Sequence, residues 1–302
     1  MKGYVTIVLV FAAILAALLM LSLSFQQTLQ MEAAEQYNRQ QLLLARAEMS
    51  NIQTYLGGVK DELLHITHSA SLFRIYRDVD FAVLSEVLFK HTSAVKKRLQ
   101  IFSHSGEILY TRGTLAVKND ALPDPTSLAK RLCPDNVLVL QNEKFYTIIA
   151  PACRSNAGIG AVAITIDIQD LAEAFLGPIK SGARGYAWMM DGKGNLLYHP
   201  SQPGMVGRNL YRADASCFGC HQSFDTEKRI IEGQADVSGR YVAPTGEDKI
   251  LAYASAPIGD ARWIVAVSSP YSEVTMAIRR SMKIYTWIVV LIFLAAGCLA
   301  AA

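Results

Sequence analysis

Cys217, Cys220 and His221 form a C-x-x-C-H motif, the attachment signature of a c-type haem. Two thiols at this spacing add across the vinyl groups at one edge of a porphyrin, and the histidine that follows is placed to bind the iron. With five cysteines and six histidines in 302 residues, chance produces roughly 0.0016 matches to the pattern. We therefore expect one covalent haem c, with His221 as the proximal iron ligand.

Two other chemistries use a C-x-x-C pair. A thioredoxin-like redox pair would leave His221 unexplained and belongs in a βαβ context. A structural zinc site needs four ligands, commonly a second pair nearby, whereas the neighbouring cysteines in this chain are Cys153 and Cys298. Both alternatives are less well supported than the haem.

The sequence leaves the sixth iron ligand open. Met205 is our first choice and His199 the second, although a histidine before a proline also serves as a structural hydrogen-bonding residue. Met189 and Met190 are adjacent on a predicted strand, so they point to opposite faces and the inward one fills the core. His104 is a more remote candidate. A sixth site that is empty or filled by water is equally possible and would suit a gas ligand.

Two apolar runs lie near the ends of the chain. Residues 4–23 and 284–302 carry no charge, and each is long enough to cross a hydrocarbon core as a helix. The alternative for the first run is a cleaved signal peptide with a small-residue site at residues 22–24, but the run is longer than a usual signal core. Lys2 favours a cytoplasmic N-terminus.

The expected compartment of the middle segment is the periplasm, because haem is attached to this motif after export. The protein would then be a two-pass protein of a bacterial inner membrane. Cys133 and Cys153 flank strand-like runs and would form a disulfide there, two buried free thiols being the alternative. The net charge of +3 is small, so no nucleic-acid partner is expected.

The pattern of apolar residues predicts an α+β fold. Steps of three and four residues predict a long helix to about Leu64, which Gly57 and Gly58 are able to kink or end. A second helix is predicted over residues 81–99. Strands follow, as a hairpin over residues 99–111 and three further strands up to residue 166.

The strand pattern then restarts, so we expect two similar antiparallel units in tandem. A short helix over residues 167–176 precedes a hairpin at residues 185–199, an irregular stretch, and three strands between residues 232 and 268. The expected organisation is transmembrane helix 1 (1–24), a long helix and helical connector (25–97), a distal unit (98–177), a proximal unit with the haem motif (178–269), and an exit helix with transmembrane helix 2 (270–302).

Residues 185–200 (GYAWMMDGKGNLLYHP), 206–210 (VGRNL), 252–258 (AYASAPI) and 263–267 (WIVAV) resemble the double Cache family of extracytoplasmic sensor domains. The resemblance covers about residues 25–283. It implies two PAS-like units stacked on the long N-terminal helix, the first distal to the membrane and the second proximal.

The chain departs from that family pattern in two places. Residues 211–231 insert the C-x-x-C-H motif before the last strands, which resembles the haem c-bearing periplasmic sensor domains of bacterial chemoreceptors and sensor kinases. The family's amino-acid-binding run, R-x-W-Y, is only faintly echoed at residues 74–77 (RIYR). Amino-acid sensing is therefore not carried over.

These features predict a membrane-anchored sensor that uses its haem to detect redox state or a small gaseous ligand and signals through the second span. The alternatives are a tethered monohaem cytochrome for periplasmic electron transfer and a small-molecule binding module in residues 98–166. No catalytic triad, phosphate loop or paired-carboxylate motif suggests an enzyme. We expect a homodimer through the N-terminal helix and, since no output domain follows the second span, a separately encoded cytoplasmic signalling protein.

Overall fold

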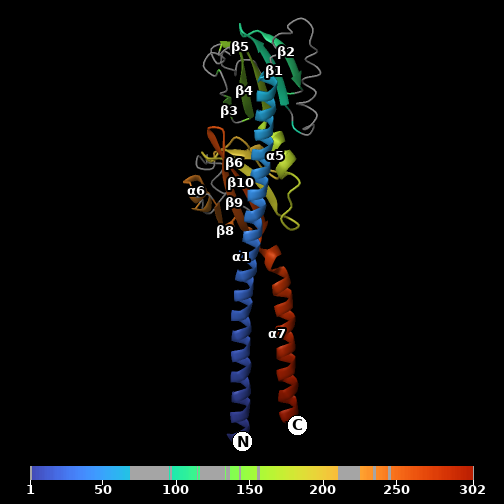
Figure 1. The fold of residues 1–302 in the computed structure, drawn as a ribbon. Coiled ribbons are helices and arrows are strands. Elements are labelled where there is room, and N and C mark those ends of the chain that lie inside the picture. Colours follow the sequence, from blue (N-terminus) through green and yellow to red (C-terminus); the bar gives the residue numbers. More distant parts are fainter. Residues whose placement is uncertain are drawn as a thin grey trace.

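The structure, a computed structural model, describes residues 2–68, 95, 97–113, 115, 133, 137–142, 144–154, 157–209, 225–233, 236–243 and 246–301. Its fold is α+β, as predicted from the sequence (Figure 1). The helices are α1 (Lys2–His68), α5 (Ile168–Leu176), η2 (Pro203–Met205, a 3-10 helix), α6 (Asp225–Ile231) and α7 (Tyr271–Ala301). The strands are β1 (Lys97–Ser103), β2 (Ile108–Gly113), β3 (Leu138–Gln141), β4 (Phe145–Arg154), β5 (Ala157–Asp167), β6 (Tyr186–Asp191), β7 (Leu196–Tyr198), β8 (Asp236–Val242), β9 (Asp248–Ile258) and β10 (Ala261–Pro270).

The strands in the described part of the chain form two antiparallel sheets of the same topology. The first sheet has the order β2-β1-β5-β4-β3, and the second has the order β7-β6-β10-β9-β8. Each unit thus places its last strand beside its first, at the centre of the sheet. The second sheet lies between the first sheet and the chain termini, which are at the same end of the molecule (Figure 1).

Helix α1 runs along both sheets and gives them a shared core (Figure 1). Its buried apolar side chains recur at three- and four-residue steps, which places them on one face of the helix. They are Ala45, Met49, Ile52, Leu56, Val59 and Leu63. Each fully buried large side chain of this set stabilises the fold by roughly 1.5–3 kcal/mol, so packing against the sheets fixes the helix.

Helix α1 formed as predicted and continues through Gly57 and Gly58 to His68, because the burial of Leu56 and Val59 outweighs a glycine cost of about 1 kcal/mol each. Two other details of the predicted secondary structure were wrong. Residues 97–99, predicted to end a helix, belong to β1, where the chain pairs with β5; residues 81–94 of that predicted helix lie outside the described residues. Helix α6 occupies a stretch that was expected to be irregular.

A buried polar contact joins α1 to the strand that leads into α7. Gln41 Nε2 donates to Ser181 Oγ at 3.1 Å and to Ser269 Oγ at 3.0 Å. Ser269 lies at the end of β10, and Pro270 is followed directly by α7. Helices α1 and α7 are both long and apolar enough to cross a membrane, over Leu9–His68 and Tyr271–Cys298 respectively. The second sheet is therefore connected to both candidate spans.

A disulfide joins Cys133 to Cys153 in β4, with the two Cα atoms 5.8 Å apart. It closes the segment that carries β3 back onto the first sheet. Cys298 is a free and exposed cysteine on α7.

Candidate functional site

The face of the second sheet that points away from α1, here called the outer face, carries the candidate site. Side chains alternate along β6, so that Met189 packs in the core beneath α1 whereas Trp188 and Met190 lie on the outer face. The other buried residues of this outer cluster are Leu196, Ile230, Val237, Leu251, Tyr253, Ile264 and Ala266. The outer face is thus apolar and rich in aromatic rings.

Two described pieces of the segment between β7 and β8 lie against the outer face. They are η2 and α6, which pack against the outer cluster through Met205, Ile230 and Ile231. Ile230 is fully buried, which fixes the end of α6 on the sheet. The same segment carries Cys217, Cys220 and His221 in the sequence.

The three motif residues lie outside the described residues, as do all of residues 210–224. The described chain ends on one side of this gap at Asn209, whose Nδ2 donates to Asn195 Oδ1 at 2.8 Å. It resumes on the other side at Asp225, the first residue of α6. The motif therefore lies in the sequence between two described pieces that are both attached to the second unit.

The two preferred sixth-ligand candidates, His199 and Met205, are both brought to the outer face. The His199 ring lies 5.1 Å from the ring of Tyr186 and 6.2 Å from that of Trp188, measured between centroids. Its Nδ1 is 3.3 Å from Ser201 Oγ, a contact that also fits the structural role considered for a histidine before a proline. Met205 is half-buried against the outer cluster.

The fold places the other three sixth-ligand candidates in three different environments. Met189 faces α1 and is fully buried, so it does not reach the outer face. Met190 is on the outer face but is fully buried in the cluster, as a core-filling side chain would be. His104 belongs to the first unit, where its Nδ1 is 2.9 Å from the carbonyl oxygen of Gly158.

Two polar groups lie on the outer face near its base. The ammonium of Lys249 donates to Tyr186 Oη at 3.1 Å and lies 3.9 Å from Glu247 Oε2. The Ser268 hydroxyl is fully buried and has no hydrogen-bond partner among the described residues.

The side chains of the outer face include aromatic rings, a thioether, an imidazole and an ammonium. These groups suit a haem, which has an apolar macrocycle, an iron that takes histidine or methionine, and two carboxylates.

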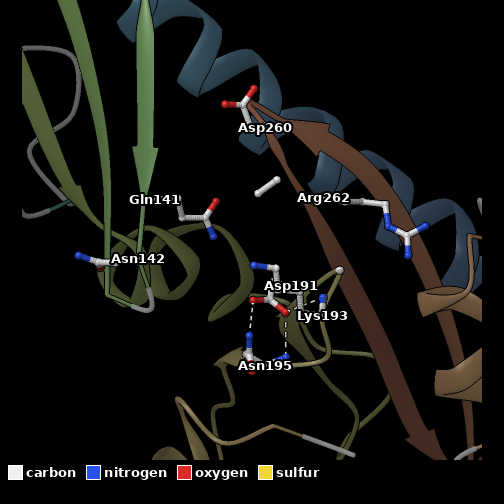
Figure 2. A pocket seen from close by; sticks show the side chains of 9 residues that line it. Gln141, Asn142, Asp191, Lys193, Asn195, Asp260 and Arg262 are labelled. Atoms are coloured by element: carbon white, nitrogen blue, oxygen red, sulfur yellow. Dashed lines mark hydrogen bonds between the residues drawn. The ribbon is translucent and has the colours of Figure 1, made fainter. Parts of the chain in front are cut away.

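A cavity of about 470 Å³ lies between the first unit and the second (Figure 2). Its polar side chains come from the β3–β4 turn, the β6–β7 turn and the β9–β10 turn. They are Gln141, Asn142, Asp191, Lys193, Asn195, Asp260 and Arg262. The Asp191 carboxylate accepts hydrogen bonds from the backbone of Lys193 and Asn195 and from the Asn195 side chain. These bonds stabilise the β6–β7 turn.

Direct contacts between the units lie beside this cavity. The buried Trp263 donates from Nε1 to Gln141 Oε1 at 2.9 Å, and its ring meets that of Tyr146 edge-on at 5.6 Å. Burial, aided by the Asp260 carboxylate, raises the pKa of Tyr146 to about 12, so this phenol stays neutral at physiological pH. We call residues 259–263 together with Gln141 and Tyr146 the inter-unit joint.

The sequence did not single out the inter-unit joint or Arg262. The joint depends on a hydrogen bond between residues far apart in the chain, and Arg262 resembles any arginine at the start of a strand. The one available signal is the glycine-aspartate turn before β10, which the sequence places between two buried strands.

Comparison with known proteins shows the same fold in sensor domains. A Cache domain profile matches residues 25–278. A domain of a protein assigned to the sensory box/GGDEF family of Vibrio parahaemolyticus is similar over 80% of this chain and 99% of its own, with 14% identity and a TM-score of 0.54. The extracellular domain of a protein described as a histidine kinase is similar over 82% and 98% of the two chains, with 15% identity and a TM-score of 0.54.

A third solved structure is the ligand-binding domain of the Pseudomonas fluorescens chemoreceptor CtaA, in complex with L-isoleucine. It covers 80% of this chain and 96% of its own, with 14% identity and a TM-score of 0.50. A search of curated proteins gave no match. The profile match spans most of the chain, and the two sheets on one long helix have the corresponding fold, so this chain belongs to the Cache domain family.

Proposed function

We propose that this chain is a membrane-anchored extracytoplasmic sensor that carries one haem c on its membrane-proximal unit. Cys217 and Cys220 would bind the haem covalently and His221 would be the proximal ligand. The observation that carries the proposal is the C-x-x-C-H motif itself, which lies in the sequence between η2 and α6, two described pieces that pack against the outer face. The Cache fold between two candidate spans supports a receptor role.

The haem would supply an iron centre that changes oxidation state or takes up a small gas. The residues of this chain set its surroundings. Trp188, Tyr253 and Met190 exclude water from the outer face, Met205 or His199 offers a sixth ligand, and Lys249 supplies positive charge for a carboxylate. A shift of η2 and α6 would alter the second sheet, and β10 leads from that sheet into α7.

The first test is an absorption spectrum of the full chain, produced with the cytochrome c maturation machinery and purified in detergent. Spectra are recorded oxidised, reduced, and reduced with carbon monoxide. A covalent Soret band supports the proposal, and its absence overturns it. A reduced form that takes up carbon monoxide favours gas sensing, whereas a low-spin form that ignores it favours redox sensing or electron transfer.

Substitution of the motif gives the matched control for that spectrum. Cys217→Ala combined with Cys220→Ala should abolish haem that resists acid–acetone extraction, because no thioether bond can form. Cys298→Ala, at the exposed free cysteine of α7, should leave it unchanged. Covalent haem in the double variant would contradict the assignment.

The two candidate spans give the proposal its topology. With α1 and α7 crossing an inner membrane side by side, both sheets would lie on the periplasmic side and α7 would return to the cytoplasmic side, towards a cytoplasmic signalling partner. We also propose a homodimer that pairs through α1. A periplasmic redox partner or a small gas would be the input.

The outer face of the first sheet supports a second candidate function, the binding of a small polar molecule. Gln100 on β1 is almost fully buried, and its Nε2 has no hydrogen-bond partner among the described residues. Thr147 and Thr165 pair through their hydroxyls at 3.1 Å on the same face. Thermal stabilisation of the full chain by one member of a panel of amino acids and small carboxylates, lost in Gln100→Leu, would establish this site.

A further inference from the structure

Arg262 connects helix α6 to the start of β10, directly after the β9–β10 turn. Its Nη2 donates to the carbonyl oxygens of Ile230, at 2.8 Å, and of Ile231, at 2.5 Å. These carbonyls belong to the last turn of α6, where intrahelical donors run out and the helix dipole is negative. A guanidinium at this place therefore holds the end of the helix.

The same turn makes the contact between the two units. Gly259 packs against Val139 of β3, and Trp263, the neighbour of Arg262, is bonded to Gln141. Figure 2 shows Gln141 and Arg262 on opposite sides of the cavity, with the arginine side chain extending away from it. Residues 259–263 thus touch the first unit on one side and α6 on the other.

Strand β10 extends from this turn to the membrane-proximal end of the molecule. It pairs with β6 and β9 along its length and ends at Pro270, where α7 begins. At the other end of the connection, α6 starts at Asp225, a few residues after His221 in the sequence. A continuous chain of contacts therefore leads from α6, the helix that follows the motif in the sequence, to the second candidate span.

We propose that Arg262 is a positioning residue that couples helix α6, which follows the motif in the sequence, to the inter-unit joint and, through β10, to α7. The inference rests on the proposed function, because it takes the state of the haem as its input. When α6 shifts on the outer face, the Ile230 and Ile231 carbonyls move with it. Arg262 then follows these carbonyls and displaces Trp263. The positions of Trp263 before and after the shift are the two conformations that a switch requires.

The test uses the full chain in detergent, labelled with 5-fluorotryptophan. The chain contains three tryptophans, Trp188, Trp263 and Trp287, and the loss of one resonance in Trp263→Phe assigns the reporter in the joint. Fluorine spectra are recorded oxidised and reduced. We expect the Trp263 resonance to shift between the two states in the unmodified protein.

Arg262→Met keeps the length of the side chain but removes its charge and donors, and should abolish that shift. Arg262→Lys keeps the charge without the two-carbonyl contact and should reduce it. Arg39→Met is the matched control, since Arg39 forms only an exposed ion pair with Glu35 one turn away on α1, and should leave the shift intact. A direct magnetic effect of the iron would persist in Arg262→Met, so a loss there identifies the mechanical link.

The outcomes separate the inference from the proposed function. A chain without a covalent Soret band overturns the proposed function, and this coupling with it. A chain that has the band but shows no redox shift of Trp263, or an undiminished shift in Arg262→Met, overturns the coupling alone. If Arg262→Met does not fold, Arg262→Lys decides, and an undiminished shift in that variant contradicts the proposal.

Discussion

If the proposed haem binds at the outer face, single side chains there decide its sixth ligand. Met205 is half-buried against the outer cluster and is closer in the sequence to the motif than His199 is. The Nδ1 atom of His199 contacts Ser201 Oγ, which leaves its Nε2 atom as the alternative ligand. A neutral thioether also favours the reduced iron, which raises the reduction potential. We therefore expect Met205 to be the ligand if the iron is six-coordinate.

Met205→Leu should open the reduced iron to carbon monoxide and lower the midpoint potential, because leucine offers no lone pair. Absorption spectra with and without carbon monoxide, combined with redox titration, check both effects. Met276→Leu, at an exposed methionine of α7, should change neither. If His199→Leu opens the site instead while Met205→Leu does not, the assignment moves to His199.

The inter-unit joint requires a residue without a side chain at Gly259. Its φ is +60°, and a Cβ atom there would lie 2.8 Å from Val139 Cγ1. Gly246 shares the positive φ, at +77°, but has open space around it. The two glycines therefore differ mainly in the contact between units.

Gly259→Ala should lower the free energy of unfolding by about 1 kcal/mol or more beyond the loss caused by Gly246→Ala, since only the first combines backbone strain with overpacking. Thermal unfolding of the full chain in detergent measures the difference. Val139→Ala should relieve part of the cost in the Gly259→Ala background. Equal destabilisation by both glycine variants would show that the inter-unit contact is loose.

Among the elements, those with strong local patterns could be predicted and those held by distant contacts could not. The spacing of apolar residues along α1 and the alternation of inward and outward side chains along β6 can be read from the local sequence. Both elements formed where expected. Helix α6 is short, and its end is held by the burial of Ile230 and by Arg262, which lies beyond two further strands. The motif and two of its candidate ligands could be found from residue types, whereas the joint that Trp263 forms could not.

The contact between α1 and β1 contains a buried lysine. Lys97 is almost fully buried at the start of β1, and this burial lowers its pKa from 10.5 to about 8, a shift that the nearby Glu62 carboxylate partly offsets. Between these two values the unfolded chain binds more protons than the folded one. The free energy of unfolding must therefore rise with pH across this range.

We expect stability to rise from about pH 8 to about pH 9.5, with a slope below about 1.4 kcal/mol per pH unit, the limit for one proton. Above pH 10 the raised pKa of Tyr146 acts in the opposite direction, because the unfolded phenol ionises first. Thermal unfolding across this range should show the rise in the unmodified chain and in Lys144→Met, at an exposed lysine. A rise that survives in Lys97→Met would show that another group is responsible.

For the whole molecule, α1 is the element that both units and the membrane share. Its buried stripe faces the two sheets, and a second stripe on the opposite side is exposed at heptad-like steps through Gln36, Gln40, Leu43, Ala47, Ser50 and Thr54. Leu43 is 62% exposed, which is unusual for a leucine on a helix that already has a buried face. Small and uncharged residues at this spacing allow two parallel helices to approach closely.

A parallel pair of α1 helices would place identical residues of this stripe against each other across a two-fold axis. Ala47→Cys, in a Cys298→Ala background, should therefore form a disulfide-linked dimer in membranes under mild oxidation, detected on a non-reducing gel. Gln53→Cys is the matched control, because Gln53 bonds to the carbonyl oxygen of Pro257 within its own chain and so faces the second unit. Equal cross-linking at both positions would indicate random collision, and cross-linking at Gln53→Cys alone would place the dimer interface on another side of the helix. Selective cross-linking at Ala47→Cys would place the two α1 helices together at the centre of the dimer. A displacement of α7 would then be a movement relative to this pair of helices, because α1 contacts the second sheet and α7 in each chain.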